Sequence, residues 1–334
     1  MFAPEIDEVH WELTNHCNLK CVHCYLAPDP RRELTTAEIK DVIDQLLEVG
    51  ALTLTLSGGE PLLRRDFAEI YQYAHGKGFV LQIFTNGTRI SPAVVELFKT
   101  HPPFKVEITL NGITAETFEK VTAVKGSFET CMSGIRAIHE AGIRLVLKTN
   151  GMTLNIHEVL KIKEFALGLN PQGFKFDTAL MPKRDHDMFP TTLRLQPSEI
   201  IALYEEDRAM KTQIQQECAG STRATPPPGS AFSCTAARTR FHISAWGDLH
   251  PCHTVRPIKV SLLEHRLPHA MQLVRDLVNG VKYPATSKCG TCDIFFQCNS
   301  CVGLAHLEGR DGGVMPTAYH CDVAHKTMET YGNR

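Results

Sequence analysis

Three cysteines near the start of the chain stand at a spacing that suits a metal cluster. Cys17, Cys21 and Cys24 form a C-x3-C-x2-C pattern, which Tyr25 follows directly. Three thiolates on one short loop can bind three irons of a cubane and leave the fourth iron without a protein ligand. Such an open iron could chelate a small molecule through an amine and a carboxylate.

A second group of cysteines lies in the last 101 residues, which hold seven of the twelve. These seven are Cys234, Cys252, Cys289, Cys292, Cys298, Cys301 and Cys321. Disulfides are the alternative use, but disulfide-rich domains are short and exported. This chain is long, and its first residues lack the charged and apolar segments of a signal peptide. The cysteines therefore favour metal ligation.

Length, composition and charge are those of an ordinary globular enzyme. The 334 residues correspond to about two domains. Hydrophobic residues make up 43% and charged residues 22%, and the formal net charge is −2. No run of Lys and Arg marks a nucleic-acid surface, and no apolar stretch approaches the ~20 residues that span a bilayer. We therefore expect a cytoplasmic protein that binds neither nucleic acid nor a membrane.

The first 210 residues alternate between strand-like and helix-like segments. Apolar or β-branched runs predict six buried parallel strands, at residues 9–13, 52–56, 79–84, 105–110, 143–149 and 173–177. Helix starts are predicted at Thr35, Asp66, Ser91, Ser127 and Asn155. Six such units predict an α/β fold with a partial barrel or an open sheet, because a closed barrel has eight.

The composition changes at residues 217–231, where three prolines stand in a row among small and polar residues. Such a segment favours an extended linker. The alternation of strands and helices stops after it, and a second domain held by metal would explain the cysteines there. We therefore predict two domains, residues 1–216 and residues 217–334, the second beginning with the proline-rich linker.

The first cysteine loop resembles the signature of the radical S-adenosylmethionine (SAM) superfamily, in which the same spacing is followed by an aromatic residue. In that family the open iron binds SAM and cleaves it reductively to a 5′-deoxyadenosyl radical. The resemblance implies a partial (β/α)6 barrel, a [4Fe–4S] cluster on Cys17, Cys21 and Cys24, and Tyr25 near the adenine. The place of the loop, after the first strand, fits the active-site edge of α/β barrels.

The second predicted strand ends in Ser57, Gly58, Gly59, Glu60 and Pro61, which resemble the GGEP motif of that family. The resemblance implies that Gly58, Gly59 and Glu60 bind the SAM amino group. Two glycines let the backbone approach a ligand closely, and a carboxylate accepts hydrogen bonds from an ammonium. The alternative is an ordinary turn before a helix.

Two further positions resemble SAM contacts of the family. Thr109 and Asn111 stand where relatives carry the Ser and Asp of a Ser-Leu-Asp-Gly segment, which implies contacts to the SAM ribose. The alternative is a strand end followed by an Asn-Gly turn. Lys120 stands where relatives often have an Arg that reaches the SAM carboxylate, and a solvent-exposed helix lysine is the alternative.

The C-terminal cysteines resemble the seven-cysteine SPASM domain, which carries two auxiliary iron–sulfur clusters in peptide-modifying radical SAM enzymes. The resemblance implies an outer cluster on Cys289, Cys292, Cys298 and Cys321. It implies an inner cluster on Cys234, Cys252 and Cys301. Cys298 and Cys301 are separated by two residues instead of the usual three. Zinc is the alternative metal, because C-x2-C pairs are also its signature.

Three other residues near these motifs have open roles. Cys218 could supply a fourth ligand to the inner cluster, and a free thiol is the alternative. Cys131 is expected to be a small buried hydrophobe. His253 stands where sulfatase-maturing relatives have an aspartate proposed as a general base. With an unperturbed pKa of about 6.5, histidine could do the same work, and a polar residue beside a cluster is the alternative.

The resemblance predicts a radical SAM oxidoreductase that acts as a peptide maturase, with a flavodoxin or ferredoxin as electron donor. The radical would abstract hydrogen from a ribosomally made peptide or protein, and oxidation or a cross-link would follow. Because the cluster loop begins at residue 17, we expect no fused leader-binding domain and a separate PqqD-like partner instead. Alternatives are a radical SAM oxidase of a haem precursor or an aminosugar, and a non-catalytic zinc or iron protein.

Overall fold

The structure is a computed structural model that describes residues 6–170, 172–219, 230–285, 287–289, 292–295, 298, 301–309, 314–315 and 317–332. Most of the predicted proline-rich linker, residues 220–229, lies outside these ranges. Within them, every helix is too short or too polar to cross a bilayer.

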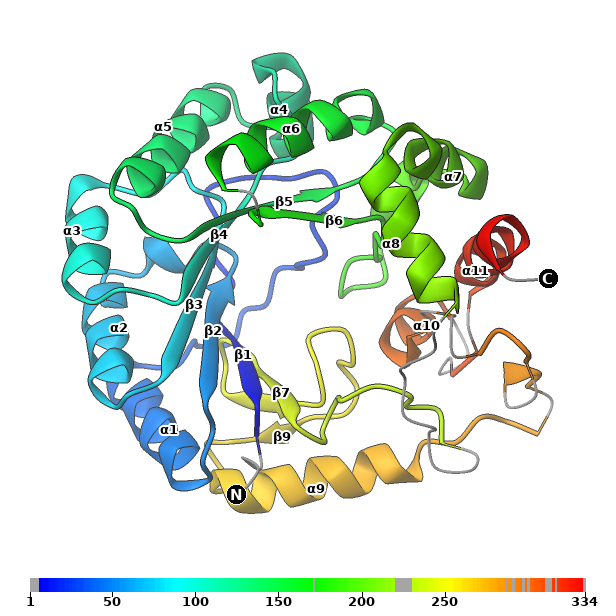
Figure 1. Ribbon diagram of the computed structural model, residues 1–334. Helices are drawn as coiled ribbons and strands as arrows, with labels where there is room; N and C mark the ends of the chain where they lie inside the picture. Colours follow the sequence, from blue (N-terminus) through cyan, green and yellow to red (C-terminus); the bar gives the residue numbers. More distant parts are fainter. Residues whose placement is uncertain are drawn as a thin grey trace.

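Six parallel strands form an arc around the centre of the molecule (Figure 1). They are β1 (Glu8–Thr14), β2 (Thr53–Gly58), β3 (Val80–Thr85), β4 (Lys105–Thr109), β5 (Leu145–Asn150) and β6 (Phe174–Asp177). Each strand pairs in parallel with the next one along the chain. The predicted α/β partial barrel is therefore confirmed, with each strand near its expected position.

Helices cover the outer side of this arc (Figure 1). They are α1 (Thr36–Glu48), α2 (Phe67–Gly76), α3 (Pro92–Thr100), α4 (Ala115–Thr122), α5 (Ser127–Glu140) and α6 (Val159–Leu169), with short 3-10 turns η1 (Pro61–Leu63) and η2 (Ile156–Glu158). The predicted starts at Thr35 and Ser91 are confirmed, because both side chains accept a bond from the first helical turn. Asp66 precedes α2 as expected, but its carboxylate binds Arg64 and Thr36 instead of capping the helix.

The strands have an apolar outer face and a polar inner face. Outward side chains such as Trp11, Leu56 and Ile83 are fully buried in one core with the helices. Inward side chains such as Glu107 and Lys148 line a central cavity. Successive strand residues point to opposite faces, so one strand can serve both environments. The predicted burial of the strands is confirmed on the outer face, and the inner face is polar and lines the cavity.

The C-terminal segment continues the same sheet. Strand β7 (Arg240–Ile243) lies parallel to β1 on its free edge, followed by antiparallel β8 (Asp248–His250) and β9 (Val260–Ser261). Helix α9 (Leu267–Gly280) packs against α1 and these strands. The sequence did not reveal these strands, because runs of two to four residues carry almost no periodic signal.

The remaining helices lie beyond β6, at the open side of the arc (Figure 1). They are η3 (Phe189–Leu193), α7 (Pro197–Glu206), α8 (Arg208–Ala219), α10 (Val302–Glu308) and α11 (Ala318–Tyr331). Helices α7, α8 and α11 pack on one another. Arg194, just after η3, donates to Glu308 at the end of α10 over 3.1 Å. The C-terminal helices are therefore tied to the loops that follow the barrel strands.

Candidate active site

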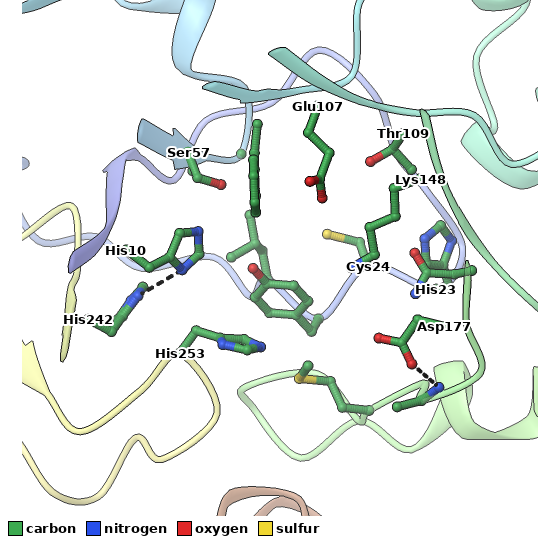
Figure 2. A pocket seen from close by; sticks show the side chains of 18 of the residues that line it. His10, His23, Cys24, Ser57, Glu107, Thr109, Lys148, Asp177, His242 and His253 are labelled. Carbon is green, nitrogen blue, oxygen red and sulfur yellow. Dashed lines mark hydrogen bonds between the residues drawn. The ribbon is translucent and has the colours of Figure 1, made fainter. Parts of the chain in front are cut away.

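A cavity of about 560 Å³ lies inside the arc of strands (Figure 2). The cysteine loop, within residues 17–26, forms one wall, and the ends of β2 to β6 form a second. Residues 234–236, 240–242 and 251–253 of the C-terminal segment form the third. The cavity is therefore built by both parts of the chain.

The cysteine loop is fixed by backbone hydrogen bonds to the end of α4. Lys20 N donates to Thr122 O over 3.0 Å, and Val22 N donates to Val121 O over 2.9 Å. Cys17, Cys21 and Cys24 are free thiols, and all three line the cavity. The structure therefore brings together the three cysteines of the predicted cluster site.

The electrostatics of these thiols fit a cationic cluster. Burial, together with the neighbouring Cys24 and Cys17, raises the pKa of Cys21 to about 12. Burial also raises the pKa of Cys17 and that of Cys24. Three neighbouring thiols with raised pKa values ionise together only when a metal compensates their charge. The donor set is therefore suited to iron.

Three thiols on one loop match the ligand number of a cubane with one open iron. Among the described residues, no three His, Cys, Asp or Glu side chains converge on one point as the ligands of one ion do. A structural zinc needs four ligands at about 2.0–2.3 Å from one ion. In a cubane each thiolate binds a different iron, so the three sulfurs stand further apart.

Gly58 and Gly59 line the cavity and also hold the cysteine loop in place. A Cβ on Gly58 would meet Thr14 O at 2.3 Å, and one on Gly59 would meet His16 O at 2.3 Å. Gly59 N donates to Thr14 O over 2.7 Å. Gly58 also has a φ of +144°, which L-residues rarely adopt. Both glycines are therefore required by the packing of β2 on the start of the cysteine loop.

Glu60 does not line the cavity. Its carboxylate is fully buried and accepts hydrogen bonds from Thr85 Oγ1 (2.8 Å), Asn86 N (2.7 Å) and Leu62 N (3.1 Å). Burial raises the pKa of Glu60 to about 7, although these hydrogen bonds act against it. In this structure the Glu60 side chain joins the ends of β2 and β3.

Thr109 and Asn111 lie together at the end of β4, and both line the cavity. Asn111 Oδ1 accepts a bond from Asn150 N over 2.8 Å, and its Nδ2 lies 3.3 Å from His23 Nε2. His23 comes from the cysteine loop, and burial, followed by the charge of Lys148, lowers its pKa to about 4. Asn111 therefore links the cysteine loop to β5.

Two lysines differ in their relation to the cavity. Lys120 is exposed on α4 and does not line the cavity. Lys148, on β5, points into it (Figure 2). The structure gives Lys148 no ion pair with any acidic side chain among the described residues, whereas Lys105 and Lys175 both bind Glu107. Lys148 is therefore a cation of the described cavity wall that is available to an anionic ligand.

Histidines cluster on the opposite side of the cavity. His10 on β1 and His242 on β7 are direct neighbours in register, and their Nδ1 atoms are 3.3 Å apart. The His253 ring lies edge-on to His10, with ring centroids 5.8 Å apart. All three rings line the cavity (Figure 2). The structure therefore places His253, the predicted base, within a group of histidines.

A buried ion pair supports these histidines. Glu12 accepts hydrogen bonds from both terminal nitrogens of Arg184, and one of them, from Nη1, measures 2.9 Å. Burial opposes the charge on Glu12, but Arg184 and His242 outweigh it and hold the pKa of Glu12 well below its usual range. Tyr25 donates to the same carboxylate over 3.5 Å, and its ring lies 6.1 Å from that of His253. Tyr25 thus connects the cysteine loop to the histidine side.

The C-terminal cysteines form two groups. Thr254 Oγ1 lies 3.0 Å from Cys252 Sγ and 3.5 Å from Cys301 Sγ. Cys234 lines the cavity together with Cys252. These three are the cysteines expected at the inner cluster.

The other group lies outside the cavity. Cys321 on α11 is close enough to Cys292 and Cys289 for their charges to raise its pKa, after the effect of burial. Cys298 is half-buried, and residues 299–300 after it lie outside the described part of the chain. These four are the cysteines expected at the outer cluster.

The two remaining cysteines are both buried. Cys218 is buried at the end of α8, where its charge affects Tyr204 and Tyr331. Cys131 is fully buried in the core, as expected.

Several polar residues of the cavity were not singled out from the sequence. They are Glu8, His10, His23, Glu107, Lys148, Asp177 and His242. A signal for some of them existed, because polar residues alternate with apolar ones in these strands, as at Glu8, His10 and Glu12. A period of two on a strand predicts that such residues share one face.

Comparisons with known proteins agree with this geometry. Residues 11–166 match the radical SAM superfamily. The AdoMet-dependent heme synthase of Methanosarcina barkeri is 33% identical over 332 residues, which cover 92% of this chain and 94% of that protein. The mycofactocin maturase MftC of Mycolicibacterium smegmatis is 38% identical over 134 residues, which cover 40% of this chain and 34% of that protein.

Solved structures share the fold at low sequence identity. Streptococcus suis SuiB bound to its precursor peptide SuiA superposes with a TM-score of 0.74 at 16% identity, covering 94% of this chain and 76% of that one. The enzyme anSMEcpe with bound AdoMet gives a TM-score of 0.72 at 14% identity, covering 97% of this chain and 96% of that one. With a relative matched along nearly its whole length, the chain belongs to the radical SAM superfamily, whose members bind a [4Fe–4S] cluster and SAM.

Proposed function

We propose that this chain is a radical SAM enzyme that oxidises an iron tetrapyrrole precursor of haem. The observation that carries the proposal is the match to a haem synthase along 94% of that protein. The mycofactocin maturase, by contrast, is matched along only 34% of its length. The match therefore includes the C-terminal segment that forms one wall of the cavity.

Residues on the cysteine side would hold the cofactors. Cys17, Cys21 and Cys24 would bind the [4Fe–4S] cluster, which together with SAM supplies a 5′-deoxyadenosyl radical. Gly58, Gly59, Thr109 and Asn111 line the same cavity and would bind SAM through backbone and polar side-chain atoms. Tyr25 and Glu60 serve the frame of the site, since both are hydrogen-bonded within the protein.

The polar residues inside the barrel suit a substrate that carries carboxylates. Lys148 projects into the cavity without an ion pair, so it can bind a carboxylate with a charge-assisted hydrogen bond. The cavity volume of about 560 Å³ is in the range of sites that enclose a drug-sized ligand. His253 and the neighbouring histidines form the wall that faces Lys148 (Figure 2).

The proposed reaction converts a propionate side chain into a vinyl group. Haem carries vinyl groups where its more highly carboxylated precursors carry propionates. One hydrogen atom leaves the β-carbon of the side chain for the 5′-deoxyadenosyl radical, which becomes 5′-deoxyadenosine. The carboxylate would then leave as CO2, and one electron would pass to an auxiliary iron–sulfur cluster as the oxidant. Cys234 and Cys252 lie in the cavity wall, so a cluster that they hold would be adjacent to the substrate.

The second candidate is the oxidation or cross-linking of a ribosomally made peptide. It is favoured by the 38% identity to a mycofactocin maturase and by the shared fold of SuiB, which has been solved with a precursor peptide. In that case a separate PqqD-like protein would bring the leader, and His253 would act as a base on the peptide. A flavodoxin or ferredoxin would supply electrons in either case.

One assay separates the two candidates. The anaerobically reconstituted chain is incubated with SAM, dithionite and either Fe-coproporphyrin III or candidate precursor peptides. We expect a tetrapyrrole product whose mass is lower by one CO2 and two hydrogen atoms for each side chain converted, as measured by mass spectrometry. The amount of 5′-deoxyadenosine should be proportional to the amount of this product. Formation of 5′-deoxyadenosine with an unchanged tetrapyrrole and a modified peptide would reverse the assignment.

A further inference from the structure

Three side chains form a continuous chain of contacts from the buried ion pair to the cavity. Glu12 Oε2 lies 3.5 Å from His242 Nε2, and His242 Nδ1 lies 3.3 Å from His10 Nδ1. His10 and His242 are paired in register on the parallel strands β1 and β7, so both rings point to the inner face. Figure 2 shows the contact between the two rings at the edge of the cavity.

The contacts determine which nitrogen atoms carry protons. Burial lowers the pKa of His242 to about 3, so this ring is neutral near pH 7. His242 Nε2 makes no hydrogen bond among the described residues, but the Glu12 carboxylate 3.5 Å away favours a proton on that nitrogen, which leaves His242 Nδ1 as an acceptor. His10 Nδ1 must then donate to it. Burial also lowers the pKa of His10, so its second nitrogen, Nε2, carries a lone pair and no proton.

That lone pair has no hydrogen-bond partner among the described residues. His10 Nε2 is buried and makes no hydrogen bond in the part of the chain that the structure describes. The ring lines the cavity, with Phe84 at 5.9 Å and His253 at 5.8 Å between ring centroids. A neutral imidazole that is held through one nitrogen by a neighbouring polar group and has its other nitrogen free is the usual form of a metal-ligating histidine.

We propose that His10 Nε2 is the axial ligand of the iron in the tetrapyrrole substrate. The inference rests on the proposed function and names the residue that recognises the metal. Lys148 acts on His10 electrostatically and lies in the same cavity. The substrate is thus held at two points, with its iron on His10 and a carboxylate on Lys148. These two contacts determine which propionate side chain reacts. His242 and Glu12 are positioning residues that keep His10 in the ligating tautomer.

The test measures binding of two porphyrins to the oxidised holoenzyme without SAM. The probes are ferric Fe-coproporphyrin III and metal-free coproporphyrin III, and the variants are His10→Ala and, as control, His139→Ala on the exposed face of α5. We expect His10→Ala to bind the iron porphyrin at least about tenfold more weakly, because even the loss of a residue that only supports a metal ligand costs about 10–100-fold. Its affinity for the metal-free porphyrin should stay within about twofold of the wild type, and His139→Ala should change neither affinity.

Spectroscopy on the wild type makes the test independent of the variant's folding. Oxidised [4Fe–4S] clusters are silent in electron paramagnetic resonance, so the ferric porphyrin can be observed alone. With ¹⁵N-histidine in the protein, we expect a ¹⁵N hyperfine coupling to the ferric iron that is absent in His10→Ala. If the wild type bound the iron porphyrin without that coupling, or if His10→Ala bound it with equal affinity, the assignment of His10 as axial ligand would be overturned. The proposed function would not be affected by either result. A wild type that binds neither porphyrin would overturn the proposed function and this assignment with it.

Discussion

The two sides of the cavity are built in different ways. The cysteine side is one loop, in which three thiols fall within eight residues and are fixed by backbone bonds to α4. The histidine side is assembled from β1, β7 and residues 251–253, and a buried ion pair between Glu12 and Arg184 supports it. One side can be made by a short sequence motif, while the other requires the completed fold.

The two sides also differ in the charge state of their buried polar groups. The thiols have raised pKa values and remain neutral until a metal arrives. The histidine side keeps its charges and balances them internally, because Arg184 offsets Glu12. We therefore expect changes on the cysteine side to remove chemistry and changes on the histidine side to cost stability or binding.

The largest effect is expected from removing all three thiols. The Cys17/Cys21/Cys24→Ala variant should lose all detectable SAM cleavage, because no other thiol lines that wall of the described cavity. About four irons of about twelve should be lost, if all three sites are cubanes. The measurements are 5′-deoxyadenosine by liquid chromatography and iron and sulfide per chain. Full loss of all iron, or SAM cleavage that persists, would contradict the separation of the clusters.

The next largest effect should come from Glu12→Gln. The change leaves the Arg184 charge buried without its partner, where Glu12 and Arg184 are 2% and 9% exposed. Breaking such a pair costs about 3–5 kcal/mol of the free energy of unfolding. Anaerobic urea unfolding of the holoenzyme, followed by circular dichroism, checks this value. Glu38→Gln is the control, since its pair with Arg32 is exposed and should cost less than about 1 kcal/mol.

A smaller effect is expected from Lys148→Met. Loss of a charge-assisted hydrogen bond costs about 1.5–3 kcal/mol, so the Kd for Fe-coproporphyrin III should rise about tenfold to a hundredfold. Lys120→Met is the matched control, because Lys120 is exposed and outside the cavity. An unchanged Kd for the porphyrin in Lys148→Met would contradict the proposed role of Lys148. Weaker SAM binding in Lys120→Met would instead support the SAM contact that the family resemblance implies for Lys120.

The smallest effect is expected from Cys218→Ala. This thiol is buried near Tyr204 and Tyr331, and it does not line the cavity that Cys234 and Cys252 line. The iron content should stay within error of the wild type, and Cys252→Ala should lose about four irons. A loss of iron in Cys218→Ala would assign this thiol to the inner cluster.

Local patterns in the sequence predicted the barrel and the cysteine side well. Six strands and the caps at Thr35 and Ser91 followed from periodicity and residue type, because these signals lie within a few residues. The histidine side was missed. His10 and His242 are 232 residues apart and meet only because β7 joins the free edge of β1. A four-residue strand offers no periodic signal from which that pairing could be predicted.

The directions in which the Lys120 side chain and the Glu60 carboxylate point could not be predicted from the sequence. Family resemblance suggested Lys120 for a SAM contact, but the helical position places that side chain on the exposed face of α4. Glu60 follows the two glycines, yet its carboxylate turns toward Thr85 and Asn86. The direction in which a side chain points depends on packing, which spacing along the chain does not encode.

The transfer of deuterium from substrate to 5′-deoxyadenosine tests the central claim most directly. Fe-coproporphyrin III with deuterium on its propionate side chains is incubated with the reconstituted chain, SAM and dithionite. The account predicts 5′-deoxyadenosine heavier by one mass unit, formed together with CO2 from the tetrapyrrole. Unlabelled 5′-deoxyadenosine beside an intact tetrapyrrole would contradict it.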